Sequence, residues 1–303
     1  MTELAIQLKN VHKYYGKVHA LRGVNLEVQR GEIFGFLGPN GAGKTTTIRC
    51  MLDLIRPNSG SIHVLGIDSQ RDPQDVKAKV SYLPGDLKLE GDFTPREFIK
   101  YLQQIRGNPR RWEDLLKLAN RLDIDLNRKI QTLSQGNKQK VGLISCFISD
   151  VPLIMLDEPT LGLDPLMQQE VLSLIREERD KGTTIFFSSH ILSEVQKVAD
   201  RVGIIRKGRL VEIAQTDTLI NHSLSQITVH FCEAVPALDF QQLPNLKIIR
   251  TNDNQRSYTL EVAGEMDSFI KTLAKYPVRD LAVHRPSLEE VFMKYYKDDG
   301  EEA

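Results

Sequence analysis

The spacing of apolar residues predicts that the chain begins with strands. Apolar and polar residues alternate over 5–8 and again over 24–28, a period of two that is typical of strands with one exposed face. Residues 201–214 predict a hairpin that turns at Lys207 and Gly208. Short, mostly apolar runs predict the strands of a parallel α/β core, over 32–37, 62–65, 80–83, 153–156 and 184–187.

Helical periodicity interrupts this pattern in the middle of the chain. From Pro95 to Asp150, apolar residues recur at the spacing of one helix face. Further helices are predicted over 46–52 and 166–180. We therefore predict an all-helical subdomain, residues 86–150, inserted into the α/β core.

Residues beyond 214 show a different mixture of elements. Strand patterns occur at 227–230, 246–249, 258–262 and 280–283, and helical patterns at 266–274 and 287–296. The predicted organisation is an α/β domain over 1–214 with antiparallel strands at its amino terminus, followed by a small α+β accessory domain over 215–303.

Composition narrows the class of protein. Lys and Arg together number 40, as do Asp and Glu, so the net charge is zero, whereas a general nucleic-acid binder carries a basic excess. The amino terminus lacks the features of a secretory signal, and no window approaches the roughly 18 apolar residues of a membrane helix. We expect a cytosolic chain that does not bind nucleic acid. If it works at a membrane, another subunit supplies the membrane span.

The three cysteines also favour a cytosolic chain. Cys50, Cys146 and Cys232 are far apart in the sequence and have apolar neighbours. We expect buried thiols in a reducing environment rather than disulfides or metal ligands.

A glycine-rich segment carries the strongest chemical signal. Residues 38–45 match the phosphate-binding pattern G-x-x-x-x-G-K-[ST], with a predicted strand before them and a predicted helix after them. Glycines let successive backbone N–H groups turn toward phosphate oxygens, and the helix adds its positive end. Lys44 is expected to reach the β- and γ-phosphates and Thr45 to ligate Mg²⁺. The nucleotide-binding residues predicted here are Gly38, Pro39, Asn40, Gly41, Ala42, Gly43, Lys44, Thr45 and Thr46.

The alternative for this segment is a chance glycine turn before a helix. The flanking strand and helix favour a nucleoside triphosphate site instead.

Two other predicted strands end in polar residues. Asp157 and Glu158 follow one apolar run, and His190 follows another. Ligands of open α/β sheets bind at the carboxyl ends of the strands, so these side chains are expected near the phosphate loop. Asp157 would hold Mg²⁺, Glu158 would activate a water as general base, and His190 would contact the γ-phosphate. The alternative is a solvated carboxylate pair at a strand end.

Further motifs resemble those of a known family. Residues 133–140 resemble the LSGGQ-type signature, and residues 161–164 resemble the D-loop. Over residues 4–214 the chain is therefore similar to the nucleotide-binding subunit of an ABC transporter. The resemblance implies that His190 is the switch histidine and that Tyr15 stacks on adenine, with Tyr14 in that role if the register slips by one. Strand packing is the other explanation for a tyrosine there.

The signature motif is expected to act on a second subunit. In this family the residues matching Ser134 and Gly136 face the γ-phosphate held by the other protomer. The resemblance thus implies a head-to-tail dimer, formed with a second copy or with a related ATPase chain, that encloses two ATP molecules with Mg²⁺.

The chain departs from the family pattern in two places. Gln135 and Asn137 replace the usual glycine and glutamine of the signature. Gly85, followed by Asp86, stands where the family places a glutamine that senses Mg²⁺ and the attacking water. We hypothesise that Asp86, or a water molecule, takes the place of that glutamine.

The end of the chain carries a second resemblance. Residues 284–292 are similar to the "PSLEDVF" ending of ATPase subunits that work with separate membrane proteins of about six helices, in the export of drugs, peptides or polymers. The same residues also predict an amphipathic helix capped by Ser287. The resemblance implies an ATPase on the inner face of the cell membrane, driving transport, most simply export, through an integral membrane permease. The alternatives are a soluble ABC ATPase acting on a macromolecular complex, and a regulator with little turnover.

Overall fold

The computed structural model describes residues 3–106, 112–216, 225–237, 240, 243, 245–252, 255–262 and 266–284. Contacts within the chain divide it into two compact units, Met1–Ala214 and Gln215–Ala303, which are described separately below.

The first unit contains an antiparallel sheet at its amino terminus. Its strands lie in the order β2-β1-β4-β5, and their bounds are β1 Leu4–Tyr15, β2 Val18–Gln29, β4 Ser59–Val64 and β5 Ile67–Asp68. The predicted antiparallel start is confirmed, but β1 and β2 are longer than the alternation suggested. The register of β1 shifts between Leu8 and Val11, where Asn10 has a φ of 49°, so a bulge breaks the period of two within a continuous strand.

A second sheet of six strands forms the centre of this unit. The order is β10-β9-β3-β8-β7-β6, with β3 Ile33–Leu37, β6 Val80–Leu83, β7 Leu153–Asp157, β8 Thr184–Ser189, β9 Arg201–Arg206 and β10 Arg209–Gln215. The pairs β6–β7, β7–β8, β8–β3 and β3–β9 are parallel, so the carboxyl ends of these strands share one edge. Every residue of β3, β7 and β8 is buried, which explains their continuous apolar runs.

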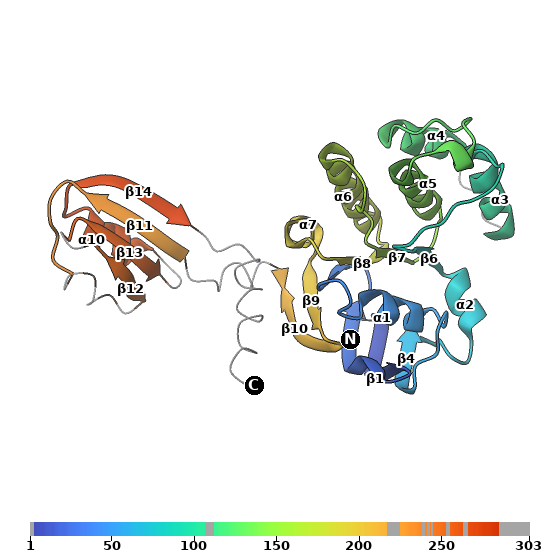
Figure 1. The fold of residues 1–303 in the computed structure, drawn as a ribbon, viewed down its shortest axis with the longest axis horizontal. Coiled ribbons are helices and arrows are strands. Elements are labelled where there is room, and N and C mark those ends of the chain that lie inside the picture. Colours follow the sequence, from blue (N-terminus) through green and yellow to red (C-terminus); the bar gives the residue numbers. More distant parts are fainter. Residues whose placement is uncertain are drawn as a thin grey trace. The chain divides into compact units, whose positions relative to one another are not determined.

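Helices cover this sheet on both faces (Figure 1). Helix α1, Lys44–Met51, contacts β2 and β4 of the first sheet and β7 of the second, so it lies between the two sheets. Helices α6, Pro165–Asp180, and α7, Leu192–Val198, contact β3 and β8. The patterning missed α7 and α2, Pro73–Ala78, because helices of 7 and 6 residues are too short to show a helical repeat.

A group of helices is inserted between β6 and β7, as the sequence predicts. It contains α3 Pro95–Arg106, α4 Trp112–Arg121, the short 3₁₀ helix Ile130–Thr132 and α5 Gln135–Phe147. Helix α5 contacts β6, α3 and α4, and it connects the inserted helices to the central sheet.

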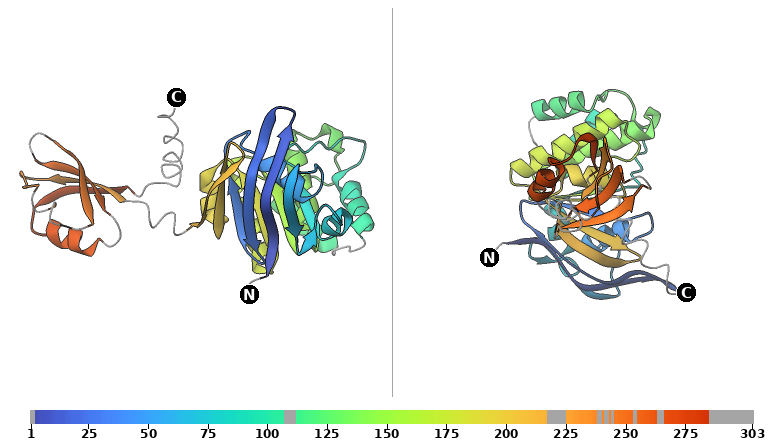
Figure 2. Two further views of the ribbon diagram at one scale, coloured as in Figure 1. Left: turned by 90° about the horizontal axis from the view of Figure 1, so that it is seen from below. Right: turned by 90° about the vertical axis from the view of Figure 1, so that its left-hand side faces the viewer.

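The second unit is a small α+β structure with its own core. The antiparallel sheet has the order β12-β13-β11-β14, with bounds β11 Ser225–Phe231, β12 Leu246–Thr251, β13 Ser257–Val262 and β14 Val278–His284. Helix α10, Asp267–Leu273, lies beside this sheet (Figure 2). Phe269 and Leu273 of the helix belong to one buried cluster with residues of β11 and β13. The predicted helix over 287–296 lies outside the described residues.

The cysteine prediction is wrong at one position. Cys50 and Cys146 are buried, and burial raises the pKa of the Cys50 thiol to about 12 and that of Cys146 to about 11. Cys232 is exposed because it follows the last residue of β11, where the chain leaves the sheet. Within the described ranges, no helix combines the length and the apolar character needed to cross a bilayer.

Candidate functional site

The glycine-rich loop joins β3 to α1 and adopts a conformation that requires its glycines. A Cβ on Gly38 would lie 2.4 Å from the carbonyl oxygen of Ile205, and Gly41 and Gly43 have φ angles of 78° and 113°. Other residues would clash or be strained at these positions. The loop therefore keeps a fixed curve ahead of the first turn of α1.

Lys44 is folded back onto this loop. Its Nζ donates to the carbonyl oxygens of Gly38 at 2.6 Å and Pro39 at 3.2 Å. The same Nζ lies 3.0 Å from Oε1 of Glu158, as an ion pair without an aligned hydrogen bond, and the Lys44 side chain is only 5% exposed. A buried ammonium group thus lies at the loop with a carboxylate beside it.

The parallel sheet brings the predicted residues together. Strand β8 lies between β3 and β7, with Leu37 opposite Ser189 and Asp157 opposite Ser188. The phosphate loop after β3, the two carboxylates at the end of β7 and His190 after β8 therefore lie at the ends of three neighbouring strands, at one sheet edge.

Asp157 presents an unpaired carboxylate oxygen to this edge. Asp157 is fully buried, and its Oδ1 accepts a hydrogen bond of 2.5 Å from the hydroxyl of Ser188. Its Oδ2 is buried and accepts no hydrogen bond among the described residues. Such an oxygen is costly to bury without a cation or a donor, so the arrangement fits Mg²⁺, for which Thr45 at the loop offers a hydroxyl.

Glu158 is held between two cationic or proton-donating groups. Its Oε1 faces Lys44, and its Oε2 lies 2.8 Å from Nδ1 of His190. The backbone of Glu158 has a φ of 52°, a left-handed conformation that is uncommon for a residue other than glycine. Backbone strain of this kind at a strand end is typical of functional sites.

A cavity of about 180 Å³ opens at the loop. It is lined by Ala20, Pro39, Asn40, Gly41, Gly43, Lys44, Thr45, Thr46 and Glu158. All but Ala20 and Glu158 belong to the predicted phosphate-binding set, so Glu158 is the carboxylate that reaches the place where phosphates are expected.

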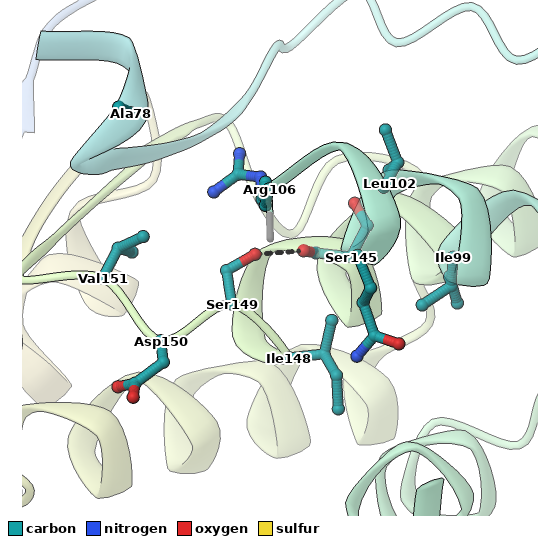
Figure 3. Close-up of a pocket in the computed structure, with 10 residues that line it drawn as sticks. Ala78, Ile99, Leu102, Arg106, Ser145, Ile148, Ser149, Asp150 and Val151 are labelled. Atoms are coloured by element: carbon teal, nitrogen blue, oxygen red, sulfur yellow. Dashed lines mark hydrogen bonds between the residues drawn. The ribbon is translucent and has the colours of Figure 1, made fainter. Parts of the chain in front are cut away.

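A second cavity, of about 190 Å³, lies among the inserted helices (Figure 3). Ile99 and Arg106 of α3 line it together with Ser145 of α5, and Ser149 donates to the carbonyl oxygen of Ser145 at 2.9 Å. Its lining contains no residue of the phosphate loop, so it is separate from the nucleotide site.

The signature residues lie at the start of α5. Ser134 is exposed and caps the helix, with its hydroxyl accepting from the backbone N–H of Asn137 at 3.3 Å. A Cβ on Gly136 would lie 2.8 Å from the carbonyl oxygen of Gly162 in the D-loop segment, so only glycine fits. Gln135 donates from Nε2 to the carbonyl oxygen of Leu87 at 3.1 Å. This departure from the family pattern therefore has a structural role.

Ser134 and Gly136 do not line the phosphate-loop cavity of their own chain. The exposed helix start is accordingly available to a ligand held elsewhere.

The two adjacent tyrosines differ in their surroundings. The Tyr14 ring stacks on His19, with centroids 4.0 Å apart. The two residues are almost equally exposed, Tyr14 at 43% and Tyr15 at 47%, and Lys13 Nζ lies 5.3 Å from the Tyr15 ring centroid. The stacking of Tyr14 on His19 favours Tyr15 as the ring that could stack on a base.

The segment after β6 is arranged differently from our hypothesis. Gly85 lies against Asp157, since a Cβ there would be 3.4 Å from Oδ2. The Asp86 carboxylate instead accepts two hydrogen bonds, of 2.9 and 3.1 Å, from Arg49 on α1, and these bonds raise the pKa of the guanidinium. Asp86 thus connects this segment to α1 rather than pointing at Asp157. Arg49 was not among the predicted residues, because no motif links it to Asp86.

Comparisons with known proteins agree with this geometry. The ABC transporter family matches residues 21–161. The daunorubicin resistance ATP-binding protein DrrA3 of Streptomyces coeruleorubidus is 31% identical, over 99% of this chain and 98% of that protein. The linearmycin resistance ATP-binding protein LnrL of Bacillus subtilis is 27% identical, over 95% and 97% respectively.

Solved structures show the same relation. The structure of an ATP binding subunit of an ABC transporter superimposes with a TM-score of 0.65 and 28% identity, over 71% of this chain and 91% of that one. Fold, phosphate loop and full-length relatives lead to one conclusion: the chain belongs to the ATP-binding subunits of ABC transporters.

Proposed function

We propose that the chain hydrolyses ATP at the sheet edge formed by residues 38–45, Asp157, Glu158 and His190, and that hydrolysis drives transport through a separate membrane subunit. The observation that carries the proposal is the position of Glu158. Its carboxylate contacts Lys44 on one side and His190 on the other, at the rim of the phosphate-loop cavity.

Binding of ATP exchanges partners within this group. The loop N–H groups and the Lys44 ammonium hold the phosphates, so Lys44 turns from Glu158 to the nucleotide. Thr45 and Asp157 would hold Mg²⁺, which when bound neutralises charge on the phosphate oxygens. Glu158 then keeps His190 as its partner, and its carboxylate is available to a water molecule.

The chemical step is attack by water on the γ-phosphorus. Glu158 accepts the proton as the new P–O bond forms and the bond from phosphorus to the bridging oxygen breaks. His190 holds the Glu158 carboxylate in place. The electrons of the broken bond remain on ADP.

Replacement of Glu158 by Gln tests this role. We expect Glu158→Gln to bind ATP with an affinity within about threefold of wild type while its turnover falls at least about 100-fold, because the amide cannot accept the proton. Size-exclusion chromatography with ATP should show the variant as a dimer. Full turnover, or a monomer in saturating ATP, would contradict the proposal.

Two chains are needed for a complete site. Ser134 and the start of α5 form an exposed helix end that does not line the cavity of its own chain, and a helix start of this kind is suited to an anion. In a head-to-tail dimer this end would meet the γ-phosphate held by the partner.

The names of the full-length relatives favour export. Both are described as resistance ATP-binding proteins, for daunorubicin and for linearmycin. We therefore propose a place on the inner face of the cell membrane, bound to a permease that carries the substrate outward. Affinity purification from solubilised membranes should recover a chain with about six hydrophobic spans. Recovery of a ribosomal or other soluble complex instead would favour the alternative, a non-transport ABC ATPase.

A further inference from the structure

A single buried hydroxyl contacts both the last residue of β7, Asp157, and the residue that follows it, Glu158. Ser188 lies on β8, directly opposite Asp157 in the parallel register, and is fully buried. Its Oγ donates to Oδ1 of Asp157 at 2.5 Å and accepts from the backbone N–H of Glu158 at 3.1 Å. The hydroxyl thus uses its one donor and one of its acceptor positions on two adjacent residues of the site.

The first bond determines which oxygen of Asp157 is free. Because the hydroxyl donates to Oδ1, the carboxylate plane is fixed and Oδ2 is the oxygen without a partner. A short bond to an ionised carboxylate is among the stronger hydrogen bonds in proteins. Gly85, whose Cβ would be 3.4 Å from Oδ2, leaves that oxygen uncovered by a side chain.

The second bond supports the unusual backbone of Glu158. Left-handed φ angles are unfavourable in residues other than glycine, because Cβ comes close to the following carbonyl oxygen. The Glu158 N–H is shared between the carbonyl oxygen of Ser188 at 3.2 Å and its hydroxyl at 3.1 Å. This conformation returns the Glu158 side chain toward Lys44 and His190.

The next residue on the strand shows that these contacts are specific. Ser189 is also buried, but its hydroxyl donates to Oε2 of Glu194 at 2.7 Å and accepts from the N–H of Ile191 at 2.9 Å. Successive side chains of a strand lie on opposite faces of the sheet, so Ser188 shares a face with its register partner Asp157 and Ser189 lies on the other face.

We propose that Ser188 is a positioning residue for the hydrolysis reaction: it orients the metal-facing oxygen of Asp157 and holds the backbone from which Glu158 acts. The inference rests on the proposed function of this site. It makes two predictions that can be tested without measuring turnover. One concerns how strongly nucleotide binding depends on Mg²⁺, and the other concerns how well the backbone amide of Glu158 is protected from hydrogen exchange.

The experiment compares Ser188→Ala with Ser81→Ala in the full chain. Ser81 is a buried serine on β6 at the edge of the same sheet, so its substitution controls for loss of a buried hydroxyl. For Ser188→Ala we expect kcat to fall about 10- to 100-fold with KM for ATP within about threefold. The Mg²⁺ concentration for half-maximal activity should rise about fivefold or more. Ser81→Ala should match wild type in kcat, in KM for ATP and in the Mg²⁺ concentration for half-maximal activity.

Two measurements, one of ADP binding and one of hydrogen exchange, do not depend on turnover. Affinity for ADP without metal should be equal in wild type and Ser188→Ala, whereas the gain in affinity on adding Mg²⁺ should be smaller in the variant. Hydrogen exchange of the peptide containing Glu158 should be faster in nucleotide-free Ser188→Ala than in wild type. Wild-type Mg²⁺ dependence and wild-type exchange in the folded variant would overturn the proposal.

Two further controls keep the outcome decisive. Thermal unfolding establishes that each variant is folded. If Ser188→Ala unfolds at the assay temperature, Ser188→Thr, which keeps the hydroxyl, should restore Mg²⁺ dependence and exchange protection, and failure to restore either would overturn the proposal. An inactive wild-type protein would refute the proposed function. In that case the role of Ser188 would still be tested by comparing wild type with Ser188→Ala in two properties: the Mg²⁺ dependence of ADP binding and the hydrogen exchange of the Glu158 peptide.

Discussion

The phosphate loop before α1 and the signature before α5 are the two helix starts proposed to contact ATP, and they are built in opposite ways. At the phosphate loop before α1, Lys44 is 5% exposed and is held by two carbonyl oxygens and Glu158. At the signature before α5, Ser134 is exposed and its hydroxyl only caps its own helix. The first half-site is closed within the chain, whereas the second faces outward.

This difference between the two half-sites fits the head-to-tail dimer proposed above. The phosphate-loop half-site has its charges compensated before nucleotide arrives, because the sheet brings Lys44, Glu158 and His190 together. The signature half-site has a helix start with glycine packed against the D-loop segment and no carboxylate bound to Ser134 among the described contacts. In the proposed dimer, ATP held at the phosphate loop of one chain would be the ligand of the signature half-site of the second chain.

Removing the cation of the closed half-site should have the largest effect. Lys44→Ala deletes the one ammonium group among the described residues that line the loop cavity. We expect ATP affinity to fall at least about 100-fold and hydrolysis to fall to background. Isothermal titration calorimetry measures the binding. Lys17→Ala, at an exposed position, is the control and should bind as wild type does. Affinity within tenfold of wild type in Lys44→Ala would show that the loop does not hold phosphate as proposed.

A negative charge at the open half-site should separate binding from hydrolysis. Ser134→Glu places a carboxylate where the partner's γ-phosphate is expected, so hydrolysis should fall about 50-fold while ATP affinity of the single chain stays within about threefold. A steady-state phosphate-release assay and a nucleotide-binding titration measure the two quantities.

Mixing variants sharpens the same comparison. A mixed dimer of Lys44→Ala and Ser134→Glu contains one composite site with both intact halves. Activity above that of either variant alone is expected. Equal inactivity of the mixture and of the separate variants would count against a site shared between chains.

The link between Asp86 and Arg49 should have a smaller effect. The pair is partly exposed, so Asp86→Ala should lower the free energy of unfolding by about 1 kcal/mol or less. ATP hydrolysis by the isolated chain should stay within about threefold, because Asp86 is directed at Arg49 and not at Asp157. Chemical denaturation and an ATPase assay check both. A loss of hydrolysis beyond tenfold would restore the hypothesis that Asp86 acts at the catalytic site.

The smallest effect concerns the ion pairs between the inserted helices and α6. Arg121 on α4 binds Glu177 through two bonds of 2.7 Å, and this contact lowers the pKa of the Glu177 carboxyl. Because the folded pKa lies below the unfolded value, the stabilisation is present above the unfolded pKa and is lost as pH falls through the folded one.

Thermal unfolding from pH 7 down to pH 3 measures this contribution. The difference between wild type and Glu177→Gln should be at most about 1 kcal/mol near pH 7 and should shrink in acid. A difference that is independent of pH would assign the effect to packing. Lys117→Gln, which removes a more exposed pair on α4, provides the comparison.

The alternating and helical patterns predicted much of the fold for simple reasons. The apolar runs at 153–156 and 184–187 are strands buried on both faces, and burial leaves an unmistakable sequence pattern. Helix α7 was missed because its 7 residues span only two turns. The continuation of β1 past Leu8 was missed because a bulge at Asn10 shifts the alternation.

Among the site residues, the sequence alone determined the glycine-rich loop, Lys44, the carboxylates at 157 and 158, and His190, since motifs and strand ends are local features. Only the tertiary structure decided their partners. That Asp86 binds Arg49, that Gln135 binds the Leu87 carbonyl and that Ser188 contacts both Asp157 and Glu158 depends on which strands and helices become neighbours. Hydrogen bonds act over about 3 Å, and residues 30 to 50 positions apart reach that distance only when the sheet is assembled.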